Sequence, residues 1–185
     1  MTWITFSIKR AISFLMGVGM LTVLANSSLA ESAQVPFGDK ISSVIFNYNR
    51  TTPYIATSGR INGAGIAELK SLGFKTILDL RTAPEGTGQE QLKAVAAGLA
   101  YHNIAISRAA PSKQQIKKFA SLVDDKNNYP MLVHCASANR AGAMWTLYRV
   151  SKGVAFSHAV QEGRTIGLRP KRENQVRKML SQPVL

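Results

Sequence analysis

The sequence predicts an α/β fold: a mostly parallel central sheet of four to five strands flanked by helices, followed by an all-helical C-terminal part. Short apolar runs alternate along the chain with segments in which apolar residues recur at helical spacing. The run Met131–His134 is apolar up to its last residue, which is typical of a central strand. From Gly153 to Leu185 only helical patterns occur. Alternating strands and helices form a sheet that is covered on its faces.

The elements follow from apolar spacing and from turn residues. We expect strands at residues 42–46, 54–57, 76–80, 101–106 and 131–134. We expect helices at residues 62–71, 89–97, 113–123, 141–151, 156–164 and 171–180. Asn62 and Ser112 are the expected N-caps of the first and third helices. Turn-rich segments, chiefly 47–53, 81–88 and 107–112, are expected as loops.

The first 30 residues have the pattern of an export signal. Lys9 and Arg10 precede an uncharged apolar stretch over residues 11–25, and small residues two apart follow at Ser28 and Ala30. The apolar stretch is shorter than the roughly 20 residues that cross a bilayer. We therefore expect cleavage after Ala30, a periplasmic or secreted protein, and no stable membrane span after processing; an uncleaved anchor is the alternative.

The chain is strongly basic, with 23 Lys and Arg against 10 Asp and Glu and a net charge of +13. Such a charge favours anionic partners such as phosphate esters or acidic lipid headgroups, or it serves only solubility. No Lys/Arg-rich block with interleaved aromatic residues is present, and we expect no nucleic-acid partner. His102, His134 and His158 lack the spacing of metal ligands, so neither a metal nor another cofactor is expected.

The candidate site is the stretch from His134 to Arg140, where the central strand is expected to pass into a helix through a tight loop. Small side chains allow the loop to curl, so that its N–H groups converge at the positive end of the helix dipole. This geometry forms a nest for a phosphate dianion. The expected phosphate-binding residues are Ala136, Ser137, Ala138, Asn139 and Arg140.

The chemistry expected at this loop is nucleophilic. The field at the helix N-terminus favours the thiolate of Cys135, the only cysteine of the chain. That thiolate attacks phosphorus, Arg140 binds two phosphate oxygens, and water then hydrolyses the cysteinyl phosphate. We expect His134 to point away from substrate and to hydrogen-bond the backbone, with a simple core histidine as the alternative. Arg81 and Arg169 are candidates to extend the anion site, with surface ion pairing as the alternative.

A histidine and cysteine followed five residues later by arginine resembles the signature of protein tyrosine and dual-specificity phosphatases. Together with residues 55–60 and 72–81, the pattern is similar to the bacterial beta-lactamase hydrolase-like phosphatase family, over roughly Val44 to Tyr148. The resemblance implies a protein tyrosine phosphatase-like fold over residues 31–185, a single phosphatase-like domain. It also implies a phosphoric monoester hydrolase that acts on phosphorylated proteins or small phosphoesters.

Three positions depart from this family pattern. Ala138 stands where the family has glycine, and a positive φ there costs an alanine roughly 1 kcal/mol or more. Ala141 replaces a hydroxyl residue that helps to stabilise the thiolate. Residues 107–112, where the general acid is expected, contain no carboxylate. Asp79 and Glu85 are the possible substitutes for that acid; a structural cap and a solvated loop residue are the alternatives.

Two other functions fit parts of the sequence. A rhodanese-type sulfurtransferase also begins its loop at a cysteine, but a histidine before the cysteine and a helical tail argue against it. A catalytically weak or inactive protein that binds phospho-ligands would explain Ala138, Ala141 and the missing acid. The sequence predicts no oligomeric state.

Overall fold

The five strands form one sheet in the order β1-β2-β5-β3-β4 in this computed structural model, which describes residues 34–185. The predicted export signal, residues 1–30, lies outside the described residues. β1 pairs antiparallel with β2, and the other three pairings are parallel, as the sequence predicts. The strands are β1 Asn49–Arg50, β2 Ile55–Ser58, β3 Thr76–Asp79, β4 Ala100–Asn103 and β5 Met131–His134.

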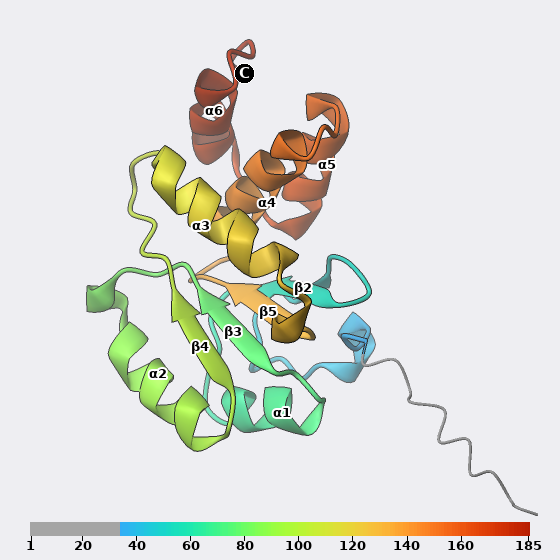
Figure 1. Cartoon of the computed structure of the whole chain (residues 1–185), viewed down its shortest axis with the longest axis vertical. Coiled ribbons are helices and arrows are strands. Elements are labelled where there is room, and N and C mark those ends of the chain that lie inside the picture. Colours follow the sequence, from blue (N-terminus) through green and yellow to red (C-terminus); the bar gives the residue numbers. More distant parts are fainter. Residues whose placement is uncertain (1–33) are drawn as a thin grey trace, which may run out of the picture. The chain divides into compact units, whose positions relative to one another are not determined.

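The helices agree with the predicted order, and the part after β5 is helical (Figure 1). They are α1 Gly65–Ser71, α2 Thr87–Ala96, α3 Lys113–Asp124, α4 Asn139–Ser151, α5 Phe156–Ile166 and α6 Pro170–Met179, with short 3-10 turns at Gly38–Lys40, Ala83–Glu85 and Lys126–Asn128. Ser112 caps α3 as predicted, in a capping box with Gln115. Asn62 does not cap α1, whose N-cap is Ala64. None of the described helices is long and apolar enough to span a membrane.

The helices cover the two faces of the sheet. In Figure 1, α1 and α2 lie on one side of it, and α3 and the C-terminal helices lie on the other. Ile77 and Leu132 of the central strands pack in the core with α1 and α2. Leu78 and Val133, the next residues of the same strands, pack in the core with α3 to α6. This alternation fixes the register of β3 and β5 and therefore the position at which β5 ends.

One predicted strand is wrong, and the first strand lies elsewhere. Residues 42–46 form no strand; Ile45 makes a single bridge to Ile61. β1 instead lies within the predicted turn segment 47–53, where Asn49 and Arg50 pair with β2. A two-residue strand that returns directly onto its neighbour has too little alternation to be recognised in the sequence.

The helix α2 has the predicted position but a different buried face. Leu92 and Val95, which carry its apolar pattern, are 66 % and 60 % exposed. Glu90 and Ala94 are buried instead. The reason is electrostatic: Glu90 faces inward, where it contacts a buried arginine and a buried histidine beside the candidate site.

Candidate active site

The loop that follows β5 lies at the carboxyl edge of the central strand, between β2 and β3. It is fastened to the chain just after β2, because the Cys135 N–H donates to the Ser58 carbonyl at 3.3 Å and the Arg60 N–H donates to the Ala136 carbonyl at 3.2 Å. Gly59 permits this approach, since a Cβ atom there would lie 3.2 Å from the Ala136 carbonyl oxygen and 3.0 Å from Phe46. The start of the loop is therefore held by direct backbone contact.

Ala138 adopts the left-handed conformation that the family pattern requires of this position, with φ 64° and ψ −6°. It is also the N-cap of α4, and its side chain caps no N–H group. The first N–H groups of a helix have no acceptor within the helix, so the N-terminus of α4 is available to an anion. Gly167 packs against the loop, since a Cβ atom there would lie 3.1 Å from the Ala138 Cβ.

Cys135 and Arg140 lie at the two ends of this loop. Cys135 is 1 % exposed, so only a group that enters the loop can reach its sulfur. Hydrogen bonds to Glu85 raise the pKa of Arg140, and the nearby Cys135 raises it further. The guanidinium therefore stays positive beside the sulfur.

The guanidinium of Arg140 is held by Glu85 through two hydrogen bonds. Its Nη1 donates to Oε2 at 2.7 Å, and its Nη2 donates to Oε1 at 2.6 Å. Nη1 also donates to the carbonyls of Leu80 and Ile106. An arginine side chain has five N–H groups. The Nε–H and one Nη2–H are not used in these contacts, and they lie together on the edge of the guanidinium plane that does not face Glu85. That edge matches two phosphate oxygens, so Glu85 orients Arg140 without occupying its second fork.

Neither candidate for the general acid is placed to donate a proton. The hydrogen bonds from Arg140 lower the pKa of Glu85 to about 2, so this carboxylate is ionised at neutral pH. Burial alone would raise the pKa of Asp79, but hydrogen bonds from Arg81 and Tyr101 and the charge of His134 hold it below its usual range. Asp79 is also fully buried. The expectation that Asp79 or Glu85 serves as the acid is not supported by this geometry.

His134 points away from the loop, as expected, but makes no hydrogen bond to the backbone. Its Nε2 lies 2.7 Å from Oε1 of Glu90 and 3.6 Å from Oδ1 of Asp79. The angles of the shorter contact fall outside hydrogen-bond geometry. Arg81 completes the buried cluster with ion pairs of 2.7 Å to Asp79 and 2.8 Å to Glu90. The alternative of surface pairing for Arg81 is therefore wrong: it pairs inside the protein.

Asp79, Glu90 and His134 are the described residues that could offer ligand atoms to one metal ion, since these atoms all lie within 4.8 Å of one another. The guanidinium of Arg81 contacts both carboxylates. A guanidinium beside both carboxylates neutralises them and repels a cation. The cluster is thus better described as an ion network that connects β3, α2 and β5 behind the loop.

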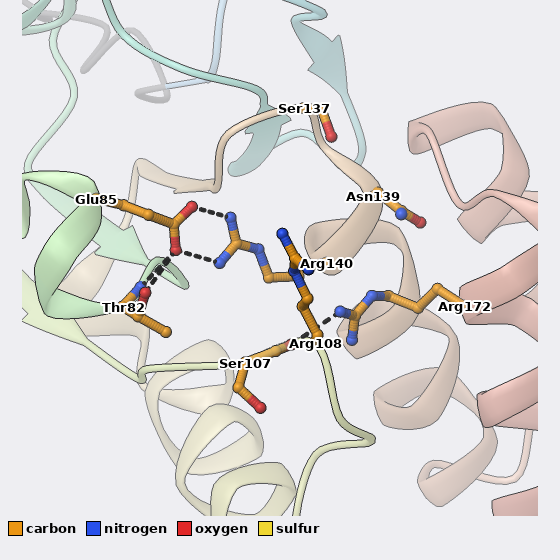
Figure 2. Close-up of a pocket in the computed structure, with 8 residues that line it drawn as sticks. All are labelled: Thr82, Glu85, Ser107, Arg108, Ser137, Asn139, Arg140 and Arg172. Carbon is orange, nitrogen blue, oxygen red and sulfur yellow. Dashed lines mark hydrogen bonds and ion pairs between the residues drawn. The ribbon is translucent and has the colours of Figure 1, made fainter.

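A pocket of about 520 Å³ opens at the loop (Figure 2). Its lining residues come from four parts of the chain: Thr82, Glu85, Ser107, Arg108, Ser137, Asn139, Arg140 and Arg172. The structure thus brings the predicted Ser137, Asn139 and Arg140 together with Glu85. Arg169 does not line it; its backbone N–H donates to Asn139.

Sequence reasoning missed Arg108 and Arg172 as pocket residues. Arg172 belongs to α6, and it reaches the pocket only because its guanidinium donates to the carbonyls of Ser107 and Ala109 at 2.8 and 3.4 Å. Burial and the charge of Arg140 lower the pKa of Arg172, and Cys135 partly offsets this. The excess of basic residues in α6 is the only signal in the sequence, and it does not single out Arg172.

Several solved structures share this fold. Tk-PTP in its active form aligns with a TM-score of 0.63 and 18% identity, over 72% of this chain and 95% of that chain. A complex of P. aeruginosa TpbA, in its Cys-to-Ser form, with pTyr gives 0.61 and 18%, over 80% and 91%. The core catalytic domain of the PP-IP phosphatase SIW14 from S. cerevisiae, in complex with citrate, gives 0.59 and 19%, over 74% and 92%. No curated relative matches the sequence.

The sequence itself matches one protein family over residues 40–180, the family described as "DSP-PTPase phosphatase fused to NAD+ Kinase". The match spans every strand of the sheet, the loop from Cys135 to Arg140 and the C-terminal helices. It confirms the predicted superfamily and argues against a rhodanese-type fold. The chain therefore belongs to this family of dual-specificity and tyrosine phosphatases, which are phosphoric monoester hydrolases.

Proposed function

We propose that this protein is an exported, cysteine-dependent phosphatase that hydrolyses phosphate monoesters through a cysteinyl-phosphate intermediate. One observation carries the proposal: a single loop at the N-terminus of α4 holds both Cys135 and Arg140, and Glu85 leaves one two-donor edge of Arg140 facing away from it. A phosphate in this loop meets the helix N-terminus, the free edge of the guanidinium and the sulfur at the same time.

In the first step, the Cys135 thiolate forms an S–P bond as the bond between phosphorus and the ester oxygen breaks. The oxygen departs with the electron pair and takes a proton from water. The first N–H groups of α4 and the free edge of Arg140 stabilise the phosphoryl oxygens as charge moves onto them. Since no lining carboxylate is available as an acid, esters with good leaving groups react fastest.

In the second step, water attacks phosphorus, the S–P bond breaks and the thiolate is restored. The products are inorganic phosphate and one proton, and this proton neutralises the hydroxide that was left when the ester oxygen took a proton from water. The network of His134, Glu90, Asp79 and Arg81 holds the end of β5, and thus Cys135, in place from behind.

The natural substrate is a phosphorylated protein or a small phosphoester. The complex of TpbA with pTyr and the naming of SIW14 as a PP-IP phosphatase support this general class. We place the protein outside the cytoplasm because of the N-terminal pattern of Lys9, Arg10 and the apolar stretch that follows.

The proposal is tested by measuring aryl phosphate hydrolysis by the wild type and by Cys135→Ser. We expect steady turnover by the wild type and none above background by the variant. The absence of a free carboxylic acid among the lining residues favours a second candidate, a protein that binds phospho-ligands without turnover. If the wild type binds phosphate but hydrolyses the aryl phosphate no faster than Cys135→Ser, the second function is established. Transfer of sulfur from thiosulfate to cyanide would instead indicate a sulfurtransferase.

A further inference from the structure

Two arginines of the pocket have no carboxylate partner among the described residues. Within residues 34–185, the guanidinium of Arg172 hydrogen-bonds only to backbone carbonyls, those of Ser107 and Ala109. In the same part of the chain, the Arg108 side chain makes no hydrogen bond or ion pair, although its own backbone carbonyl accepts from Gln175. Arg140, by contrast, is neutralised by Glu85. Apart from the sulfur of Cys135, whose charge acts on Arg172, residues 34–185 provide no counter-charge for these two arginines.

Of these two charges, that of Arg172 is fixed in the pocket, and that of Arg108 is on an exposed side chain whose backbone is held. The two carbonyl contacts hold Arg172, which is half-buried, and Gln175 of the same helix holds the backbone at Arg108. In Figure 2 Arg172 enters the pocket from the side away from Thr82 and Glu85, and in this view the Arg108 side chain lies between the two sides. An arginine held in place with donors to spare is suited to bind an oxyanion, because little side-chain freedom is lost on binding.

The first phosphate of a substrate has its own binding groups. The N-terminus of α4 and the free edge of Arg140 are sufficient to hold one phosphoryl group over Cys135. Arg108 and Arg172 come from two other parts of the chain, the segment after β4 and α6. A pocket of 520 Å³ corresponds to a sphere about 10 Å across, which is wide enough for a small ligand with two phosphate groups.

We propose that Arg108 and Arg172 bind a second phosphate group of the substrate, so that the preferred substrates are small phosphoesters that carry two phosphates. This inference rests on the proposed phosphatase function and specifies the substrate class of the same pocket. One phosphate of the substrate lies in the Cys135–Arg140 loop and is transferred to Cys135. The other is bound by Arg108 and Arg172 and leaves with the product.

Binding to the Cys135→Ser protein tests this inference without relying on turnover. The probes are phenyl phosphate and 1,4-phenylene bisphosphate, compared by calorimetry at one fixed ionic strength. We expect the bisphosphate to bind about tenfold more tightly or better, since charge-assisted hydrogen bonds to a second phosphate contribute at least that factor. A bisphosphate has two equivalent phosphates, so chance alone makes its binding constant about twice that of phenyl phosphate. A measured ratio of about two therefore overturns the proposal.

A second substitution assigns the preference to the arginine. Arg108→Gln, made in the Cys135→Ser protein, is expected to reduce the ratio to the statistical value. It does not threaten the fold, because the exposed side chain makes no hydrogen bond or ion pair within residues 34–185. Lys117→Gln is the matched control, because Lys117 is an exposed cation of α3 that does not line the pocket. It is expected to keep the tenfold preference. A preference that survives Arg108→Gln contradicts the assignment.

The same two probes, used as substrates of the otherwise unchanged protein, separate this proposal from the proposed function. If neither probe is hydrolysed, the proposed phosphatase function is contradicted. The ratio of the two binding constants still tests the proposed second phosphate site in that case. If phenyl phosphate is hydrolysed and the two probes have equal kcat/KM per phosphate, the phosphatase stands and the second site is refuted.

Discussion

Replacing Glu85 by glutamine tests the role assigned to its contact with Arg140. The carboxylate accepts from Nη1 and Nη2 of Arg140 at 2.7 and 2.6 Å. Glutamine has nearly the same shape, but it carries no charge and only one of its two terminal atoms accepts a hydrogen bond. Glu85→Gln therefore removes one of the two hydrogen bonds and the whole electrostatic attraction, while the backbone of the turn stays as it is.

The cost to stability follows from the titration of Glu85. Its pKa is lowered from 4.5 to about 2, and each unit corresponds to about 1.4 kcal/mol, which sets an upper limit of about 3.5 kcal/mol. Because the side chain is 32% exposed, screening by solvent reduces the expected loss to about 1–2 kcal/mol. A lowered pKa stabilises the folded state fully above the unfolded value of 4.5, and this stabilisation is lost as the pH falls toward 2.

Urea unfolding at several pH values measures this loss. We expect Glu85→Gln to be about 1–2 kcal/mol less stable than the wild type at pH 7, and the difference to shrink below pH 4.5 and vanish near pH 2. The control is Asp124→Asn, which removes an exposed ion pair of 2.6 Å to Lys152 and should cost less than about 1 kcal/mol. A pH-independent difference, or one no larger than in the control, would refute this explanation.

The same variant tests whether Glu85 supports or blocks Arg140. If Glu85 orients the guanidinium, the Glu85→Gln protein should lose about 10-fold to 100-fold in kcat/KM for an aryl phosphate, because a displaced binding group weakens transition-state contacts. If Glu85 instead competes with phosphate for the same donors, the variant binds inorganic phosphate more tightly than the wild type. Tighter binding would contradict the free edge assigned to Arg140.

Two further predictions concern the loop and the chemistry. Ala138→Gly should change the free energy of unfolding by less than about 1 kcal/mol, because relief of the positive φ offsets the lost buried methyl group and the greater entropy of the unfolded chain. The control is Ala141→Gly, at an equally buried position within α4, which should cost about 2 kcal/mol in the same urea assay. Equal costs for the two variants would mean that Ala138 is not strained. The ratio of kcat/KM for aryl esters to kcat/KM for alkyl esters should be about 10²–10⁴ times larger than the same ratio for a phosphatase with a general acid. Equal ratios for the two enzymes would reveal an acid that the pocket lining does not include.

The central part of the fold could be predicted because its signals are local. The run Met131–His134 is apolar up to its last residue, and small residues follow it at once, so the strand, the loop and the start of the next helix are all evident in one stretch. The helix N-cap at Ser112 is equally local, since it depends on Gln115 three residues later. These signals also placed Cys135 and Arg140 on the loop that the structure shows.

The rest depends on contacts between distant parts of the chain. The apolar spacing of Leu92 and Val95 suggested the buried side of α2, but the ion contacts of Glu90 with Arg81 and His134 orient the helix the other way. No neighbouring residue in the sequence indicates these partners.

The candidate site shows the same limit. No feature of the sequence shows whether Glu85 orients Arg140 or acts as a general acid. The orienting role depends on its contact with Arg140, which lies 55 residues away along the chain. Arg172 reaches the pocket through the carbonyls of Ser107 and Ala109, across 65 residues of chain. Only the folded arrangement defines such residues.

The central claim is that Cys135 is the nucleophile. The most direct measurement is acid quenching of the enzyme during turnover of an aryl phosphate, followed by mass spectrometry of the peptide that contains Cys135. We expect one phosphoryl group on this peptide, present during turnover and absent from Cys135→Ser. Because Cys135 is the only cysteine of the chain, no other thiol can account for the signal. Steady hydrolysis without any phosphorylated Cys135, or hydrolysis that persists in Cys135→Ser, would contradict it.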